Sequence, residues 1–161
     1  MRIEKGTLLD DRYRVKRVLG QGGMGTVYEA VNERIDRRVA IKVLSPNLVK
    51  DRRALKRFRR EAKAAAAVRS GHVTEVYDFG DFGDGSSFIV MEYLEGQTLS
   101  ARMAAAGKMD PAELLGIVRQ LLRGLAATHE SGIIHRDLKP ENVFLTTGPN
   151  GEPDYVKILD F

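Results

Sequence analysis

The sequence predicts an α+β fold, in which an antiparallel five-stranded sheet with one main helix is followed by the start of a helical part. Two observations support this prediction. In the first 95 residues, short runs rich in β-branched side chains are separated by Gly-rich and Asp-rich turns. From about residue 96, apolar residues instead recur every three or four positions, as on an amphipathic helix. The change falls in the stretch YLEGQT, residues 93–98, which predicts two parts, 1–95 and 96–161.

Five strands and one helix are expected in the first part. Apolar and polar side chains alternate in residues 13–20, which predicts a strand. Residues 25–32 follow a Gly-rich turn and residues 37–44 are a short β-branched run, so each predicts a further strand. Pro46 and Asn47 interrupt this pattern, and Asp51 can cap a helix that continues through the alanine run 62–67 and ends by Gly71. Two further strands are predicted over residues 73–79 and 88–93, on either side of the turn GDGSS.

The second part is expected to contain two helices and a hairpin. A short helix is predicted over residues 99–106, and Asp110 followed by Pro111 is typical of the start of a second helix, over 112–130. The runs VFLTT and YVKIL, separated by the polar turn GPNGEPD, predict a hairpin. The apolar stripe of the longer helix consists of Leu114, Leu115, Val118, Leu121, Leu122 and Leu125.

The composition excludes several classes of protein. The 161 residues include no cysteine, which excludes disulfides and cysteine-ligated zinc. No apolar run approaches the roughly 18 residues of a membrane span, and the first ten residues do not resemble a secretion signal, so we expect a cytoplasmic chain without a membrane segment. The net charge is +4, and much of the basic excess lies in the run KDRRALKRFRREAK. Because Leu55, Phe58 and Ala62 recur at helical spacing behind these charges, we interpret the run as a solvated helix face and expect no nucleic-acid partner.

The stretch GQGGMGTV, residues 20–27, is a candidate phosphate-binding turn. Its glycines allow the backbone to approach a ligand closely and to present N–H groups to phosphate oxygens. The dinucleotide fingerprint requires a helix after such a turn, whereas TVYEAV is typical of a strand. This motif alone therefore leaves two interpretations, a phosphate-binding turn and a plain Gly-rich hairpin.

Lys42, at the end of VAIK, is a cation inside a run of β-branched and apolar residues. Such a lysine is often just an exposed alternate position of a strand. Glu61, however, lies among Ala and Phe on what should be the inward side of the predicted helix, where a carboxylate is costly unless it is paired. We therefore hypothesise a Lys42–Glu61 ion pair that directs the ammonium group toward bound phosphates.

The stretch HRDLKPEN, residues 135–142, is the most specific motif of the chain. It places Asp137, Lys139 and Asn142 in a short irregular segment between the apolar runs GII and VFL. A loop of this kind with three polar side chains usually carries chemistry. The alternative is that the three residues simply cap and solvate a turn that contains proline.

Taken in order, these motifs resemble the signature set of protein kinase catalytic domains. The match consists of G-x-G-x-x-G-x-V at residues 20–27, VAIK ending at Lys42, the helical Glu61, H-R-D-L-x-x-x-N at residues 135–142, and the terminal Asp160 and Phe161. It covers essentially the whole chain. DLKPEN is typical of the serine/threonine type, and GQGGMGTVYEA is similar to bacterial eukaryotic-like kinases. The resemblance implies a kinase-like fold with an ATP-binding small lobe in residues 1–95 and a partial large lobe in residues 96–161.

The resemblance also implies roles for individual residues, with ATP and Mg²⁺ as cofactors and a protein with Ser or Thr as substrate. Lys42, paired with Glu61, would contact the ATP phosphates. Asp137 would accept or orient the proton of the substrate hydroxyl, and Lys139 would offset charge on the transferred phosphate. Asn142 and Asp160 would hold the magnesium ions. The other implied nucleotide contacts are Leu19, Gly20, Gln21, Gly22, Gly23, Met24, Gly25, Val27, Ala40, Met91, Glu92, Leu94 and Phe144.

Within that set, the resemblance divides the contacts with the adenine ring. Val27, Ala40 and Phe144 would sandwich the ring between apolar surfaces. Met91 would stand at the back of the adenine pocket. The backbone of Glu92 and of Leu94 would bond the adenine edge.

The tripeptide Asp-Phe-Gly occurs twice, at residues 78–80 and 81–83, and the chain ends on Asp160 and Phe161. In the kinase family the metal-binding Asp follows the catalytic-loop Asn, so only Asp160 fits that role. Asp78 and Asp81 are therefore expected to be structural residues of the strand-turn region. The interval from Asn142 to Asp160 is longer than is usual in the family. We interpret the polar stretch TTGPNGEPD as a lengthened hairpin turn that accounts for this difference.

Kinases of this family continue beyond Asp-Phe with an activation segment and further helices. We therefore expect the 161-residue piece to expose the apolar stripe of its longer helix and to transfer phosphate poorly by itself. There are two hypotheses for its function. The chain is part of an ATP-dependent serine/threonine kinase, or it is a truncated nucleotide-binding or interaction module with weak or no activity. The sequence predicts neither the substrate protein nor the oligomeric state.

Overall fold

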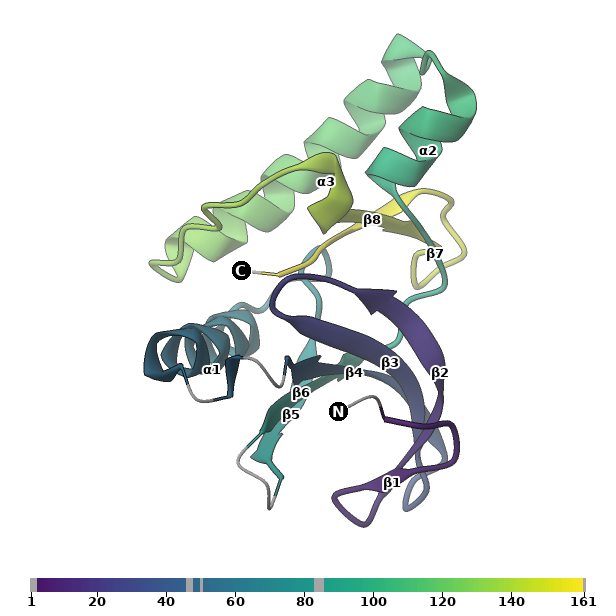
Figure 1. The fold of residues 1–161 in the computed structure, drawn as a ribbon. Helices are drawn as coiled ribbons and strands as arrows, with labels where there is room; N and C mark the ends of the chain where they lie inside the picture. The colour runs from purple at the N-terminus through teal and green to yellow at the C-terminus, as the bar shows by residue number, and fades with distance from the viewer. Residues whose placement is uncertain (1–2, 46–47, 50, 83–85, 161) are drawn as a thin grey trace. The chain divides into compact units, whose positions relative to one another are not determined.

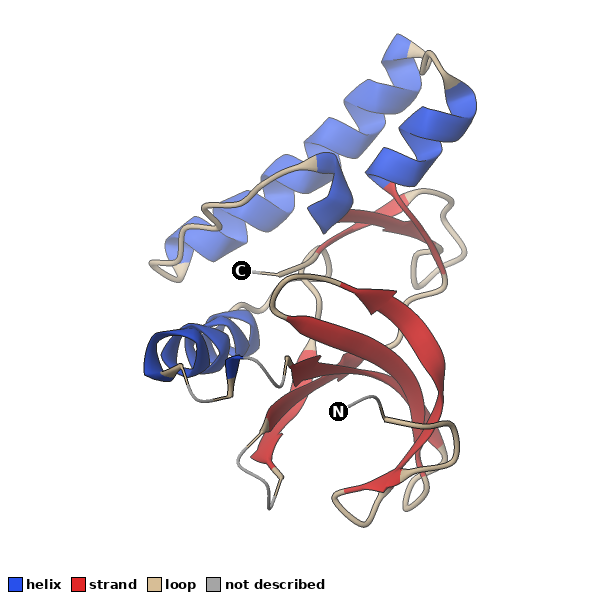
Figure 2. Cartoon of the chain, viewed as in Figure 1, coloured by secondary structure: helices blue, strands red, loops and turns tan. Residues whose placement is uncertain are grey.

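The computed structural model of the chain describes residues 3–45, 48–49, 51–82 and 86–160, except for the side chain of Glu61. These residues belong to two units. Figure 1 colours the chain by residue number, and Figure 2 colours it by secondary structure. The first unit comprises Met1–Lys63 and Glu75–Tyr93, and the second comprises Ala64–Thr74 and Leu94–Phe161. The expected break at Pro46 and Asn47, the first three residues of the turn GDGSS, and Phe161 lie outside the described residues.

The first unit contains an antiparallel sheet of six strands in the order β1-β2-β3-β4-β6-β5. Five of these strands were predicted, and the additional one is the two-residue β1, which pairs with β2 through Leu8–Arg14 and Leu9–Tyr13. Strand β5 begins at Val76 instead of residue 73, because Val73 forms a parallel bridge with Ile158. The strands are β1 Leu8–Leu9, β2 Tyr13–Gln21, β3 Gly25–Asn32, β4 Arg37–Leu44, β5 Val76–Asp81 and β6 Ser87–Glu92.

Each face of this sheet packs against a different part of the first unit. On one face, alternate residues such as Tyr28, Ile41 and Val90 form a core with the N-terminal Ile3 and Leu9. The other face packs against helix α1, Arg52–Ala67, which Figure 1 shows beside the sheet. The contacts on that face come from Leu44, Phe58, Ala62 and Ile89.

Helix α1 begins where the sequence predicts and ends earlier than expected. The Asp51 carboxylate accepts hydrogen bonds from the backbone N–H groups of Arg53 at 2.8 Å and Ala54 at 3.3 Å, which confirms it as the cap. The helix ends at Ala67, four residues before Gly71. The following Val68 leaves the helix and is buried with Val73 and Ile158.

The second unit combines three helices with a three-stranded sheet in the order β7-β8-β9. The predicted hairpin is confirmed as β8 and β9, whereas the three-residue β7 was not predicted. Asp110 caps α3 through the N–H groups of Ala112 and Glu113, at 2.8 and 3.3 Å. The elements are β7 Gly96–Thr98, α2 Leu99–Ala106, α3 Pro111–Glu130, the 3₁₀ helix η2 Pro140–Asn142, β8 Val143–Thr146 and β9 Tyr155–Ile158.

Helix α3 packs through one side and exposes the predicted apolar stripe on another. Ile117, Gly124 and Thr128 are buried. A side chain at Gly124 would place its Cβ 2.7 Å from Ile158, so glycine allows α3 to lie close to β9. Leu121 and Leu125 are partly buried, whereas the other stripe residues are exposed, among them Leu122 at 58%. Within the described ranges, none of the helices combines the length and apolar character that a bilayer-spanning segment needs.

Candidate active site

The predicted site residues divide between the two units. The first unit carries the glycine turn, the strand residues Val27, Ala40, Lys42 and Met91, and Glu92. The second carries the segment that contains Asp137 and the residues around it. The other predicted members in the second unit are Leu94, Lys139, Asn142, Phe144 and Asp160.

The glycine turn joins β2 to β3 and closes on itself. The N–H of Gly22 donates to the carbonyl of Gly25 at 2.9 Å, and the reverse bond measures 3.3 Å. A side chain at Gly25 would place its Cβ 2.1 Å from the carbonyl oxygen of Val43, so only glycine permits this approach to β4. A Cβ at the other three glycines would meet nothing within 4 Å, so the turn is open to a ligand. The remaining predicted residues here are exposed or half-buried: Leu19, Gly20, Gln21, Gly23 and Met24.

The strand register brings four predicted nucleotide contacts to one face of the first sheet. Val27 lies opposite Lys42, and Ala40 lies opposite Met91. Because side chains alternate along a strand, residues 40 and 42 point to the same side, together with their partners. We call this surface the nucleotide face. Glu92 ends β6, and its backbone N–H donates to the carbonyl of Glu75 at 2.9 Å.

Lys42 is buried in the middle of the nucleotide face, with 7% of its surface exposed. A buried ammonium group requires nearby acceptors or negative charge. The predicted partner Glu61 belongs to α1, but its side chain lies outside the described parts of the structure. The Lys42–Glu61 ion pair therefore stays a prediction.

In the second unit, His135 anchors the predicted catalytic loop to the end of the chain. Its ring is buried, and Nδ1 accepts the backbone N–H of Asp137 at 3.3 Å. Because Nδ1 faces a donor, Nε2 carries the proton and donates to the carbonyl of Leu159 at 2.8 Å. Arg136 turns the chain at φ 66°, a left-handed conformation that is uncommon for a residue with a side chain. No role was predicted for His135 from the sequence, although it opens the most specific motif.

Asp137 and Lys139 form an ion pair on the surface of the loop. The Lys139 ammonium lies 2.7 Å from Oδ2 of Asp137. This hydrogen bond holds the pKa of Asp137 below its ordinary value, and Coulombic attraction to Lys139 and a bond from Asn142 act in the same direction. The same bond raises the pKa of Lys139, with smaller contributions from Glu141 and Asp160. Both groups are therefore charged near neutral pH.

Asn142 connects the loop to the residue that precedes Asp160. Its Nδ2 donates to the carbonyl of Asp137 at 2.9 Å and to Oδ2 of that residue at 3.3 Å. Its own carbonyl accepts the N–H of Leu159 at 2.9 Å. Leu159 is thus held at both backbone atoms, by Asn142 and by His135, and the exposed Asp160 follows at φ 48°.

The oxygen atoms of this arrangement suit a magnesium ion. Since Nδ2 of Asn142 is the donor toward Asp137, Oδ1 is the atom of this side chain that could bind a cation. Amide and carboxylate oxygens are the hard ligands that Mg²⁺ prefers, and it commonly takes only one or two from the protein. No group of three His, Asp or Glu side chains in the described residues could hold a metal by itself. Phe144 is half-buried in β8, directly after this segment.

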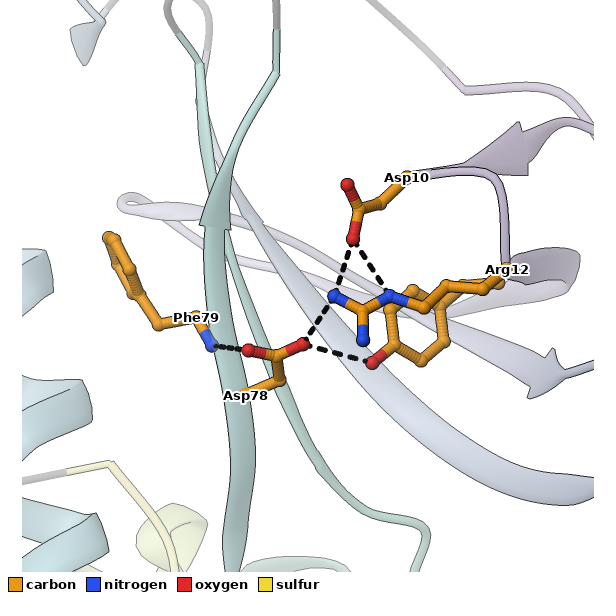
Figure 3. A network of polar contacts seen from close by, with 5 residues as sticks. Asp10, Arg12, Asp78 and Phe79 are labelled. Carbon is orange, nitrogen blue, oxygen red and sulfur yellow. Dashed lines mark hydrogen bonds and ion pairs between the residues drawn. The ribbon is translucent and has the colours of Figure 1, made fainter. Parts of the chain in front are cut away.

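The aspartates of the two earlier Asp-Phe-Gly motifs form ion pairs within the first unit. Figure 3 shows Asp78 bonded to Arg12, with 2.7 Å between Oδ2 and Nη2, while Arg12 also binds Asp10. The hydroxyl of Tyr13 donates to Asp78 at 3.2 Å, and burial together with this carboxylate raises the pKa of Tyr13. Asp81 pairs with Arg59 at 2.8 Å. Both carboxylates therefore connect parts of the first unit.

Known proteins resemble this chain over nearly its whole length. A family model described as "Protein kinase domain" matches residues 13–161. A probable serine/threonine-protein kinase pknA2 of Bifidobacterium longum is 42% identical over 161 residues, covering 98% of this chain and 20% of that protein. The serine/threonine-protein kinase pkn2 of Myxococcus xanthus is 46% identical over 154 residues, covering 96% of this chain and 18% of that protein. The chain thus spans about a fifth of the length of these two relatives.

Solved structures share the fold. The crystal structure of the Mycobacterium tuberculosis PknI kinase domain superposes with a TM-score of 0.82 at 34% identity. The superposition covers 100% of this chain and 63% of that one. The predicted fold class is confirmed, with six strands instead of five in the first sheet.

Proposed function

The chain belongs to the protein kinase domain family, and from this we propose that it is the N-terminal part of an enzyme that transfers a phosphoryl group from ATP to Ser or Thr hydroxyls of proteins. The observation that carries the proposal is the hydrogen-bonded arrangement of Asp137, Lys139 and Asn142 next to Asp160. A module that only binds nucleotide has no chemical need for this arrangement. The enzyme hypothesis is therefore favoured over the interaction module.

Asp137 is proposed to orient the substrate hydroxyl. Its carboxylate, whose pKa is held below the ordinary value by Lys139, is ionised near neutral pH and accepts a hydrogen bond from the attacking O–H. A carboxylate with a lowered pKa is a weak base, so it takes up the proton late, as the new P–O bond forms and the bond to the leaving ADP oxygen breaks. Lys139 keeps its positive charge and offsets the negative charge of the transferred group.

Asn142 and Asp160 are the proposed ligands of magnesium, through Oδ1 and the carboxylate. When bound, the ion supplies positive charge that screens the phosphate oxygens of ATP. The chain's own contribution is to hold the two side chains in place, through the bonds of Leu159 with Asn142 and His135.

The nucleotide is proposed to bind through the glycine turn and the nucleotide face. Backbone N–H groups of the open turn and the ammonium of Lys42 supply donors and charge for the phosphates. Val27 and Ala40 offer apolar surface for the adenine ring. Leu19, Met91 and Phe144 are proposed as further contacts of the ring, and the backbone of Glu92 and of Leu94 is proposed to bond its edge. The side chain of Glu61 is proposed to pair with Lys42.

Two aspartates in Asp-Phe motifs provide a matched test. In the protein expressed from its complete coding sequence, Asp160→Asn should lower Mg²⁺-dependent transfer of labelled phosphate to casein by about 100-fold or more. Asp78→Asn also removes a carboxylate that precedes Phe, but one bound to Arg12 and Tyr13, so its rate should stay within about threefold. Equal losses in the two variants, or no transfer by the unaltered protein, would contradict the proposal.

A further inference from the structure

The nucleotide face continues into a cluster of charged residues near the end of the first unit. In β3, Glu29 follows Val27 by two positions and therefore points to the same side. Its partner across the ladder is Ala40, the proposed adenine contact. The cluster thus begins directly beside the surface on which the adenine ring is proposed to lie.

Glu29 is a buried carboxylate, with 9% of its surface exposed. Two arginines from the neighbouring strands bind it, one at each oxygen. Nε of Arg17 in β2 lies 2.7 Å from Oε2, and Nη2 of Arg38 in β4 lies 3.2 Å from Oε1. A buried carboxylate is costly unless it is paired, and here a single carboxylate fixes two guanidinium groups.

Both arginines also contact Tyr93. The guanidinium of Arg38 stacks on the ring, with its central carbon 4.0 Å from the ring centroid. Nη2 of Arg17 donates to the tyrosine hydroxyl at 3.2 Å. Tyr93 is therefore held at its face and at its hydroxyl by two groups that Glu29 keeps in place.

The position of Tyr93 in the chain gives this cluster its significance. Tyr93 is the last residue of the first unit, so the chain leaves the unit directly after it. Its neighbours Glu92 and Leu94 are the residues whose backbone is proposed to bond the adenine edge. A ring fixed at position 93 therefore limits the movement of the backbone on which base binding depends.

We call residues 92–94 the connector. We propose that four residues form a clamp that positions the backbone of the connector for adenine: Arg17, Glu29, Arg38 and Tyr93. They are positioning residues and not catalytic ones. The inference rests on the proposed function, because it assumes that ATP binds at the nucleotide face. It assigns a role to Glu29, which orients the two arginines and through them Tyr93, without contact with the nucleotide.

The test compares two Arg–Glu pairs in the protein expressed from its complete coding sequence. Glu29→Gln should raise KM for ATP about five- to tenfold and leave kcat within about twofold, because the loosened connector weakens binding and not the chemical step. It should also reduce the preference for ATP over GTP in kcat/KM about fivefold, since the connector reads the edge of the base. A residue with only a structural role would not move this preference.

Glu33→Gln is the matched control. Glu33 pairs with Arg14 of β2, with 3.0 Å between Oε2 and Nη2, but this pair is exposed and does not involve Tyr93. The Glu33→Gln variant should have the same KM for ATP and the same preference for ATP over GTP as the unaltered protein. If Glu29→Gln lowers the amount of folded protein, Tyr93→Leu, which leaves the arginine–glutamate pairs intact, provides the same comparison.

The outcomes separate the clamp from the proposed function. If the unaltered protein transfers phosphate and both Glu29→Gln and Tyr93→Leu keep its KM for ATP and its ATP preference, the clamp is wrong and the kinase proposal stands. If the unaltered protein neither binds ATP in calorimetry nor transfers phosphate, the proposed function itself fails. A loss of kcat at unchanged KM in Glu29→Gln would also overturn the clamp, because it would indicate an effect on chemistry.

Discussion

The pKa of Asp137 is lowered mainly by one neighbouring side chain. The hydrogen bond from Lys139, 2.7 Å long, is the largest cause of its lowered pKa, and partial desolvation acts against it. A lowered pKa means that the carboxylate stays ionised as the pH falls through the range where an ordinary Asp becomes protonated. If the reaction needs ionised Asp137, the rate should fall only when the pH drops below that range. This fall at low pH is the acid limb of the pH–rate profile.

Replacing Lys139 should therefore move the acid limb. In Lys139→Met the pKa of Asp137 should rise toward its ordinary value, so the acid limb of the kcat/KM profile should shift to higher pH, in addition to a lower maximal rate. Lys108→Met, a change at an exposed lysine after α2, should leave the limb in place. An acid limb at the same pH in Lys139→Met and the unaltered protein would show that Lys139 does not set the pKa.

Helix α3 and the hairpin β8–β9 depend on each other. The Gln120 side chain accepts the N–H of Val156 at 3.1 Å and donates to the carbonyl of Asp154 at 3.0 Å, so it binds the start of β9 as a neighbouring strand would. Arg102 of α2 binds both Asp154 and Glu113, the latter at 2.8 Å. The turn before β9 is thus held in place by side chains of α2 and α3.

Two glycines of α3 should respond to alanine in opposite directions. Gly124→Ala would bring a methyl group to 2.7 Å from Ile158 and 3.1 Å from His72, and should lower the free energy of unfolding by about 1–3 kcal/mol. At Gly116 a Cβ meets nothing within 4 Å, so Gly116→Ala should raise it by up to about 1 kcal/mol, because alanine favours the helix. Urea titration measures the free energy of unfolding of both variants. A stabilising Gly124→Ala would mean that α3 does not pack against β9 as described.

At the level of the whole chain, the sequence predicts the elements that depend on local pattern. Strands β2 to β4, the caps Asp51 and Asp110 and the hairpin β8–β9 were predicted from neighbouring residues in the sequence, and all are present. Strands β1 and β7 could not be predicted. They have only two and three residues, and they exist because longer strands offer them backbone partners.

The candidate site shows the same limit. The motifs identify Asp137, Lys139 and Asn142, but not the bonds that join Asn142 to Asp137. The pairing of Glu29 with two arginines also could not be predicted from the sequence, because it depends on the register of three strands. Alternation does place Glu29 on the side of Val27, and this was the available signal.

The measurement that tests the central claim most directly is phosphate transfer with the modified residues identified. The protein from its complete coding sequence is incubated with ATP, Mg²⁺ and casein, and mass spectrometry locates the new phosphates. We predict phosphoserine and phosphothreonine with the unaltered protein, and a rate about 10²- to 10⁴-fold lower with Asp137→Asn. Undiminished transfer in Asp137→Asn, or phosphate found on tyrosine only, would contradict the assignment of Asp137 in a serine/threonine kinase.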